Sequence, residues 1–392
     1  MSNSNNNNRR VPKLRFPEFT GEWEEMPLSN YLFEHKSKSD GKCEVHSVSV
    51  SKGVINQVEY LGRSFAAADT SKYNMVKPND IIYTKSPTGA FPYGIIKQNK
   101  NSYDVIVSPL YAVYTPTNKY LGYILDSYFE SPERTNNYLS SLVQKGAKNT
   151  IQISNDTFVS KPICLPSNPA EQQKIAECLT EMDNLISAQA QKVELLKTHK
   201  KGLMQQLFPQ PDETTPQLRF PGFTGEWEEK KFGDCFEIGS GRDYKHLTKG
   251  NIPVYGSGGY MCSVNNFLFD GESACIGRKG TINNPMLLHG KFWTVDTLFY
   301  TYNYVDTFAY FIYLLFLNID WMKHNEAGGV PSLSKTIINN ISVHLPKMLE
   351  QQKIAECLSE LDKDIEAESA KLEALKAHKK GLMQQLFPEP IK

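Results

Sequence analysis

Two stretches of the chain carry apolar residues at alternating steps of four and three. The first runs from Ile175 to Leu207 and the second from Ile354 to Leu386. A sustained 3.5-residue period predicts a long α-helix that pairs with another helix in a coiled coil. The predicted seam residues are Ile175, Leu179, Met182, Ile186, Val193, Leu196 and Leu203 in the first stretch, and Ile354, Leu358, Leu361, Ile365, Leu372, Leu375 and Leu382 in the second.

The helix ends are also marked in the sequence. Asn168 predicts an N-cap, Pro169 the first helical position, and Glu171 completes a capping box. Pro209 and Pro388 stop the two helices. Polar residues interrupt each seam twice, and we expect them to fix the register of pairing at some cost in stability. These residues are Gln189, Lys200, Glu368 and Lys379.

The two helical stretches are copies of each other. Residues 171–209 recur as 350–388 with 28 of 39 positions identical, at an offset of 179. PKLRFPEFTGEWEE from Pro12 recurs as PQLRFPGFTGEWEE from Pro216 with 12 of 14 identical, at an offset of 204. Since 204 minus 179 is 25, the material between the repeated blocks is 25 residues shorter in the second copy. The pattern predicts a constant frame that holds two different inserts.

Matched seams favour pairing of the two helices with each other, in an antiparallel arrangement with one insert near each end. Packing of each helix on its own domain alone is the alternative. Each insert contains short β-type runs with turns, and helical stretches are predicted at Lys119–Tyr138 and Thr307–Met322. We therefore expect an α+β fold: a disordered tail (1–11), a first insert domain (12–166), a first spacer helix (167–209), a linker (210–215), a second insert domain (216–346) and a second spacer helix (347–388).

Composition narrows the class of protein. The chain has 43 basic and 43 acidic side chains, so its net charge does not indicate a polyanion partner, although it permits one. No apolar run is long enough to span a bilayer, and the polar N-terminus does not resemble a signal peptide, so we expect a cytoplasmic protein. Seven cysteines without a CxxC pattern and eight histidines without ligand spacing predict neither disulfides nor a metal site.

Motifs for catalysis were not found. The sequence has no phosphate-binding GKS or GKT loop, no GxSxG, and no Asn-Pro-Pro-Tyr motif of amino-methyltransferases. YGSGG at Tyr255–Gly259 lacks the remainder of a dinucleotide-binding loop and reads as a glycine turn. We expect no catalytic residues in this chain.

Several basic and polar side chains suit nucleic-acid contacts, because they fall on predicted turns between strands. Taken singly, each basic residue is more often a solvated surface charge. The candidates are Lys85, Ser86 and Thr88 in TKSPTG, Lys148, Asn149 and Gln152 in KGAKNTIQ, Arg242 and Lys245 in GSGRDYK, and Arg278 and Lys279 in GRKGT.

As an ensemble, these features resemble the specificity subunit of a Type I restriction-modification system. The resemblance rests on the paired RFPEFTGEWEE and RFPGFTGEWEE segments and the paired helices from EQQKIAECL to QQLFP. It rests also on IPVYGSGG, IGRKGTI and PSLSKTIINNI in the second insert. These last segments add the DNA-binding candidates Tyr255, Ser257, Thr281 and Ser332.

The resemblance implies that the inserts are target-recognition domains, each binding half of an asymmetric bipartite site in double-stranded DNA. It implies that the spacer helices dock two modification subunits, which methylate adenine with S-adenosylmethionine. Restriction subunits that use ATP and magnesium would join the assembly, and this chain would hold no cofactor itself. A bilobed, non-catalytic protein-protein scaffold and an enzyme with a cryptic site are the alternatives.

Overall fold

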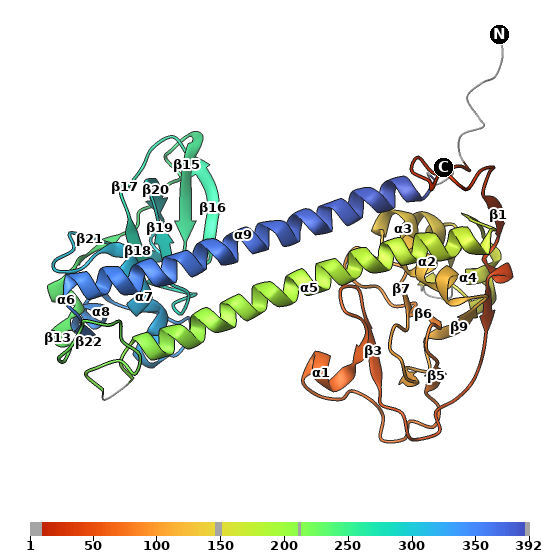
Figure 1. Cartoon of the computed structure of the whole chain (residues 1–392), viewed down its shortest axis with the longest axis horizontal. Helices are drawn as coiled ribbons and strands as arrows, with labels where there is room; N and C mark the ends of the chain where they lie inside the picture. The colour runs from red at the N-terminus through yellow and green to blue at the C-terminus, as the bar shows by residue number, and fades with distance from the viewer. Residues whose placement is uncertain (1–9, 146–150, 211–212, 389–392) are drawn as a thin grey trace, which may run out of the picture. The chain divides into compact units, whose positions relative to one another are not determined.

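The computed structural model describes residues 10–145, 151–210 and 213–388. It has the expected α+β composition and divides into two compact units. Unit 1 combines residues 1–189 with 371–392, and unit 2 consists of residues 190–370. The division falls inside both long helices, α5 (Pro169–Leu207) and α9 (Met348–Leu386), so each unit contains a part of both (Figure 1).

Unit 1 is built from short strands with four helices of its own besides the long pair, among the residues that the structure describes. Its elements are β1 (Glu24–Pro27), η1 (Leu28–Asn30), β2 (Leu32–Glu34), β3 (His46–Ser49), β4 (Gly53–Asn56), α1 (Gln57–Leu61), β5 (Asn74–Val76), β6 (Ile81–Tyr83), β7 (Ile96–Gln98), β8 (Val105–Val107), β9 (Ala112–Pro116), α2 (Lys119–Phe129), α3 (Pro132–Ser140), β10 (Gln144–Lys145), β11 (Ile151–Gln152), α4 (Asn155–Ser160) and β12 (Pro162–Leu165).

Unit 2 has longer strands in its middle. Its elements are β13 (Glu228–Lys231), α6 (Phe232–Cys235), β14 (Glu237–Ser240), β15 (Lys249–Gly256), β16 (Gly259–Val264), β17 (Phe269–Asp270), β18 (Ser273–Gly277), β19 (Met286–Leu288), β20 (Lys291–Thr294), β21 (Leu298–Tyr302), α7 (Ala309–Asn318), η3 (Trp321–His324), α8 (Lys335–Asn340) and β22 (Ser342–Leu345).

Each unit contains a four-stranded antiparallel sheet of the same topology. The strand order is β2-β9-β6-β7 in unit 1 and β14-β21-β18-β19 in unit 2. Tyr114 of β9 lies between Glu34 and Ile81, and Tyr300 of β21 lies between Gly239 and Cys275. The two tyrosines therefore occupy equivalent positions, and each is followed by a threonine. This register aligns the two inserts strand by strand despite their different sequences.

The extra sheets make the inserts different. Unit 1 adds the two-stranded pairs β3-β4, β5-β8 and β10-β11, whereas unit 2 adds a second four-stranded sheet, β16-β15-β20-β17. In Figure 1, β15 and β16 lie side by side as a hairpin with β20 as the next neighbour. The two units thus share the four-stranded sheet and an equivalent two-stranded pair, β1-β12 or β13-β22, and differ in the other strands.

The long helices pair antiparallel within each unit. In unit 2, Lys192 contacts Glu368 and Lys200 contacts Asp362, so the partner number falls as the first number rises. In unit 1, the ammonium of Lys379 lies 2.7 Å from a carboxylate oxygen of Asp183. The predicted seam residues of both helices are all buried or half-buried. Two of the polar seam residues, Lys200 and Lys379, make the equivalent ion pairs across the helix pair.

The repeated segments, residues 12–25 and 216–229, each bind the start of one long helix, and we call these segments the clasps. The guanidinium of Arg15 donates two hydrogen bonds to Glu171 at 2.7 and 2.8 Å, and Arg219 donates two to Glu350 at the same distances. Both glutamates are almost completely buried at the start of a long helix. Hydrogen bonding to Glu171 raises the pKa of the Arg15 guanidinium, with burial acting against it. Each unit therefore has an arginine-glutamate pair at the start of one long helix.

Each clasp also packs on the end of the helix from the other repeat. In unit 1, the Trp23 ring contacts Phe387 of α9's end edge-on, at 6.5 Å between centroids. In unit 2, Trp227 contacts Phe208 at 6.0 Å in the same geometry. The backbone amides of Leu14 and Leu218 donate to the carbonyls of Gln385 and Gln206. The core of each unit thus needs one segment from each repeat of the frame.

Two predicted helical stretches are each divided in the structure. Lys119–Tyr138 falls in α2 and α3, because Ser131 caps the second helix and Pro132 begins it. Thr307–Met322 contains α7, which ends before Ile319, and the first two residues of η3. Among the residues described, no helix is long and apolar enough to cross a membrane, and no cluster of metal-ligating side chains occurs.

Candidate nucleic-acid interface

The register of the shared sheet places two sequence-predicted loops at the same position. Ile81 and Cys275 occupy equivalent places beside Tyr114 and Tyr300. Counting four residues onward from each gives Lys85 in unit 1 and Lys279 in unit 2. The loops that follow β6 and β18 are therefore equivalent, although they were selected from unrelated motifs. This equivalence could not be read from the sequence, because the loops share only the lysine at that point.

In unit 2, the loop after β18 is held by hydrogen bonds on several sides. The amides of Arg278 and Lys279 donate to the carbonyl of Thr297, at 2.8 and 3.3 Å. The Ser257 hydroxyl donates to the Lys279 carbonyl at 2.8 Å. The backbone of Lys279 also forms an isolated antiparallel β-bridge with Ser332. The structure therefore brings four sequence-predicted residues together from three separate segments, while both basic side chains stay exposed.

Gly277 explains how this loop folds so tightly. A side-chain carbon placed there would come within 2.1 Å of the Thr281 carbonyl oxygen. Only glycine allows the chain to turn back at that point. The turn leaves Arg278, Lys279 and Thr281 at the surface.

A third cation at this site was missed by the sequence analysis. Lys335, the first residue of α8, donates to the Ile238 carbonyl at 2.6 Å. Its ammonium lies 6.0 Å from the centroid of the Phe299 ring, and the Arg278 guanidinium lies 5.9 Å from the same centroid. The sequence signal that could have indicated Lys335 is its position directly after the helix cap Ser334. Ser154 of unit 1 caps α4 with the same hydrogen bond. Unit 2 therefore gathers Arg278, Lys279 and Lys335 around one loop.

The equivalent loop of unit 1 has a different chemistry. Lys85 donates to the side chain of Asn155, which in turn donates to Glu34 at 2.6 Å. Burial lowers the pKa of Lys85, while the charge of Glu34 acts in the opposite direction. Lys85 also has a positive φ of 59°. The amide of Asn155 is thus held in a fixed orientation between a cation and a carboxylate, whereas Ser86 and Thr88 are exposed.

The other candidates are distributed differently. Lys148 and Asn149 lie outside the described residues, and Gln152 pairs with Gln144 in the β10-β11 hairpin. Arg242 and Lys245 are exposed on the segment between β14 and β15. Tyr255 is half-buried, with its ring edge-on to Tyr260 at 6.1 Å. The DNA-binding role of all these residues stays a prediction.

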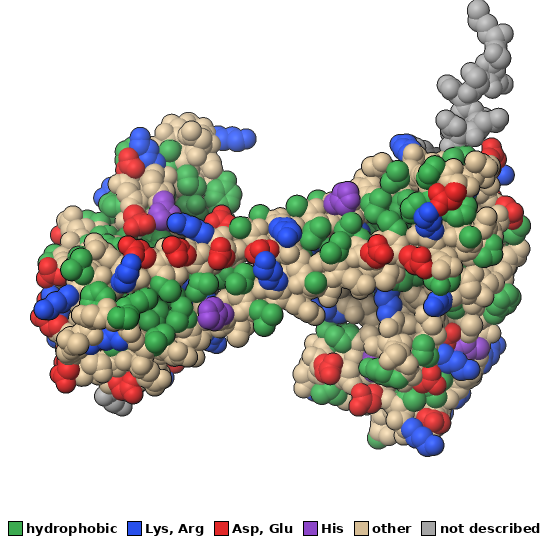
Figure 2. All heavy atoms as spheres, in the orientation of Figure 1, with side chains coloured by type: hydrophobic (Ala, Val, Ile, Leu, Met, Phe, Trp, Pro, Cys, Tyr) green, Lys and Arg blue, Asp and Glu red, His purple; other side chains and the backbone are tan. Residues whose placement is uncertain are grey.

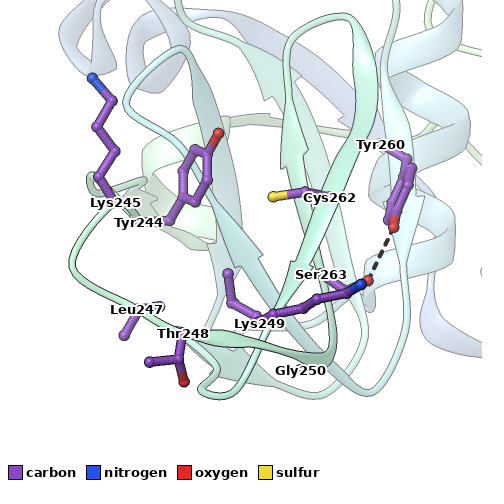
Figure 3. A pocket seen from close by; sticks show the side chains of 10 residues that line it. Tyr244, Lys245, Leu247, Thr248, Lys249, Gly250, Tyr260, Cys262 and Ser263 are labelled. Carbon is purple, nitrogen blue, oxygen red and sulfur yellow. Dashed lines mark hydrogen bonds between the residues drawn. The ribbon is translucent and has the colours of Figure 1, made fainter.

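A groove runs along β16 between this strand and the segment before β15. Two adjoining hollows of about 650 and 550 Å³ form it, and both are lined by Tyr244, Lys245 and Tyr260. We call the two hollows together the β16 groove. Its other lining residues are Leu247, Thr248, Lys249, Gly250, Cys262, Ser263 and Val264 in the first hollow, and Asp243, Gly256, Ser257, Gly258, Gly259, Met261, Val295, Asp296 and Thr297 in the second. Figure 3 shows the sulfur of Cys262 pointing toward the Tyr244 ring and away from Tyr260. Tyr260 was not predicted from the sequence, because the glycines before it indicate only a turn.

The two helices display a repeated surface as well as a repeated seam. Several exposed residues are identical in the two copies, and each unit shows one complete set because each contains the start of one helix and the end of the other. In unit 1 the set is Gln173, Lys174, Glu177, His378, Lys380, Gln384 and Gln385. The equivalent residues in unit 2, in the same order, are Gln352, Lys353, Glu356, His199, Lys201, Gln205 and Gln206. Packing alone does not require identity at exposed positions.

Charge over the visible face of the molecule is mixed. Figure 2 shows acidic and basic side chains interspersed over both long helices. This agrees with 43 basic and 43 acidic side chains in the whole sequence. The cation group around the loop after β18 is a local feature, not part of a general positive charge.

Comparisons with known proteins agree with this organisation. The model of a family described as Type I restriction modification DNA specificity domain matches residues 38–198 and again residues 224–377. The MjaVIII specificity subunit of a Type I restriction enzyme from Methanocaldococcus jannaschii is 33% identical over 129 residues, which is 32% of this chain and 28% of that protein. The putative MjaX specificity subunit from the same organism is 24% identical over 257 residues, 59% of this chain and 60% of that protein. The match therefore spans less than two thirds of the length of either curated relative.

Solved structures show the same fold. The S subunit of a Type I restriction-modification system from M. genitalium matches with a TM-score of 0.62 at 18% identity, covering 97% of this chain and 100% of that one. A chain from a structure on complex assembly and conformational transition of the type I R-M system matches with a TM-score of 0.50 at 15% identity, covering 93% and 96%.

Proposed function

We propose, from the premise that this chain belongs to the Type I restriction modification DNA specificity domain family, that it is the DNA-reading subunit of a Type I restriction-modification complex. Its two units would each bind one half of an asymmetric, bipartite site in double-stranded DNA. The observation that carries this proposal is the pair of equivalent loops with unlike chemistry. One frame position presents a cation group in unit 2 and an oriented amide in unit 1.

The chemistry of the two loops suits two different half-sites. An arginine or lysine on an exposed loop can take a guanine edge or a phosphate, so Arg278 and Lys279 fit either role. An amide held by its neighbours, as Asn155 is held by Lys85 and Glu34, fits an adenine edge. Unit 2 would then depend more strongly on salt than unit 1, because more of its contacts would be with phosphates.

Docking of two identical partners follows from the repeated exposed set. Each unit offers the same exposed side chains from one helix start and one helix end, which fits one modification subunit bound at each unit. Those subunits would supply S-adenosylmethionine and methylate adenine. Restriction subunits using ATP and magnesium would complete the assembly, so this chain would act as a non-catalytic adaptor.

The test is methylation mapping of DNA from cells that express this chain with a modification subunit of its system. The expected result is a new methyl-adenine in a split, asymmetric motif that is absent when this chain is left out. Arg278→Ala in the same complex should relax or weaken one half of the motif and leave the other half unchanged. A complex that assembles but produces no new motif would favour the non-catalytic protein scaffold.

Matched substitutions separate DNA reading from folding. Lys279→Ala removes an exposed loop cation, and Lys323→Ala removes an exposed lysine in η3 of the same unit. The first should weaken binding to target DNA and reduce its dependence on salt by about one counterion. The second should leave DNA binding and its salt dependence unchanged, because Lys323 lies outside the proposed DNA contacts. Neither substitution alters a buried side chain, so both variants should fold.

A further inference from the structure

Beyond the loop after β18, the β16 groove of unit 2 has the features of a second recognition surface. Tyr260 and Met261 follow each other on β16 with 62% and 51% of their surfaces exposed. Large apolar side chains left adjacent and exposed at the wall of a groove are typical of a binding surface rather than of a packed strand. The Tyr260 hydroxyl is within 3.0 Å of the Ser263 hydroxyl, which restrains the ring.

Charge is distributed unevenly along this groove. Exposed Lys249 lines only the first hollow and exposed Lys245 lines both, and the described residues that line the first hollow include no carboxylate. In the second hollow, Asp243 and Asp296 bring two exposed carboxylates near the same tyrosines. A phosphate would be favoured in the first hollow, and a base amino group, such as that of cytosine, in the second. Duplex DNA presents both groups at neighbouring places.

The groove is continuous with the loop already described. Ser257 lines the hollow that contains the aspartates, and its hydroxyl donates to the carbonyl of Lys279. The β15-β16 turn is therefore fixed to the cation group by a hydrogen bond. β15 and β16 form an antiparallel hairpin at the edge of the four-stranded sheet, and paired strands are among the shapes that the major groove of DNA admits. A single DNA segment could contact the loop and the β16 groove together.

We propose that the β16 groove is where unit 2 discriminates between DNA sequences, with Tyr260 contacting a base and Lys245 and Lys249 holding the neighbouring phosphates. This inference rests on the proposed DNA-reading function and adds residues to it. Tyr260 is the specificity-determining residue, because it lines both hollows and is 62% exposed. The lysines supply affinity that does not depend on sequence.

The test uses the full chain in complex with its modification subunit. Methylation mapping should show that Tyr260→Ala relaxes the motif at one position of one half-site, with a loss of discrimination of about 5- to 150-fold, as expected for one base contact. The other half-site should not change. Lys249→Ala should leave both half-sites intact, weaken DNA binding, and reduce the salt slope by about one. Val305→Ala, at a 54%-exposed apolar residue of unit 2 outside the groove, is the matched control.

The outcomes distinguish the two levels of the proposal. If the complex with Tyr260→Ala methylates the wild-type motif and discriminates between bases as before, the β16 groove does not read sequence in unit 2. The same conclusion follows if the substitution relaxes both half-sites equally. If the unsubstituted complex assembles without producing any split motif, the DNA-reading function fails and the groove proposal fails with it. Relaxation by Val305→Ala as large as that by Tyr260→Ala would also overturn the assignment.

Discussion

Unit 1 and unit 2 close their cores with corresponding residues, but the hydrogen bonds around those residues differ. In unit 1, the buried indole N–H of Trp23 donates to Glu171 at 3.1 Å. In unit 2, the equivalent N–H of Trp227 is buried without a partner among the described residues. The frame repeats its shape more faithfully than its polar contacts. The comparison teaches that the arginine-glutamate pair, present in both units, is the common requirement.

The same contrast appears where each insert meets the helix pair. In unit 1, Tyr123 bonds to Asp183, and Lys379 lies 2.8 Å from Glu130 as well as 2.7 Å from Asp183. In unit 2, the Tyr310 hydroxyl donates to Asp362 at 2.8 Å, and Lys200 pairs with Asp362. Both units therefore join a tyrosine of the insert, an aspartate and a lysine of the two helices. Unit 1 adds to this group a second carboxylate, Glu130, and a second cation, Lys100, whose ammonium lies 3.8 Å from Asp183.

The largest expected effect would come from removing the shared arginine. Arg15→Met and Arg219→Met should each destabilise their own unit by about 3–5 kcal/mol, because a buried glutamate loses its counter-charge. Glu171 is 1% exposed and Glu350 is 2% exposed, so the two effects should be similar. Hydrogen exchange of the backbone amides of β1-β12 and β13-β22 measures each unit separately. A large effect in only one unit would show that the two clasps are not equivalent.

The next effect should separate the units. Lys379→Met leaves Glu130 and Asp183, which are partly exposed, with Lys100 as the remaining nearby cation, so unit 1 should lose about 2–3 kcal/mol. Lys200→Met removes a partner of one carboxylate that keeps its Tyr310 bond, and unit 2 should lose about 1–2 kcal/mol. Urea unfolding, followed by hydrogen exchange in each unit, gives both numbers. The reverse order would contradict the importance of Glu130.

The tryptophans offer a smaller but sharper comparison. Trp23→Phe removes a hydrogen bond to a charged acceptor, which should cost about 1.5–3 kcal/mol in addition to lost packing. Trp227→Phe removes a buried donor that has no partner among the described residues, so its polar contribution should be about zero or slightly favourable. The packing loss is common to both, and the difference between the two unfolding free energies reports the hydrogen bond. Equal losses would mean that the Trp227 N–H is satisfied in solution.

The smallest expected difference at neutral pH, in the stabilities of unit 1 and unit 2, should increase as the pH is lowered. Burial raises the pKa of the Asp126 carboxyl, but Lys97 and Lys100 outweigh burial and hold it below its ordinary value. Such a carboxylate contributes stability above its unfolded pKa of about 4, and this is lost as the pH falls through the folded pKa. Three residues after Tyr310, unit 2 has Tyr313 where unit 1 has Asp126 after Tyr123. Unit 1 should therefore lose more stability than unit 2 as the pH falls from about 6 to about 3, a range that brackets the ordinary pKa of aspartate. Asp126→Asn should flatten that dependence.

The frame could be predicted because its signals are local and repeated. Apolar spacing defined both helices, and two copies of the same segment indicated two equivalent clasps. The antiparallel pairing also appears in the structure, with Lys200 and Lys379 in its ion pairs. By contrast, the shared sheet is formed by distant strands whose side chains meet different neighbours, so its sequence is free to differ. Identity in this sheet persists at Tyr114–Thr115 with Tyr300–Thr301, and at Ile82 with Ile276.

The candidate site was harder to predict for the same reason. Arg278 and Lys279 were visible as a loop motif, but Lys335 joins them only through the fold of α8 beside β14 and β21. Lys85 was chosen as an exposed cation, whereas the structure ties it to Asn155. Sequence shows which side chains are able to contact DNA. The contacts that orient them depend on residues far away in the chain.

The division of both long helices between the units has a consequence for synthesis on the ribosome. Unit 2 is contained within residues 190–370 and can be completed while the chain is still growing. Unit 1 begins first but needs Met383, Leu386 and Phe387 from the last part of α9 to fill its core. The earliest domain to emerge is therefore the last to mature, and a chain interrupted before these residues would display an open apolar core to chaperones and proteases.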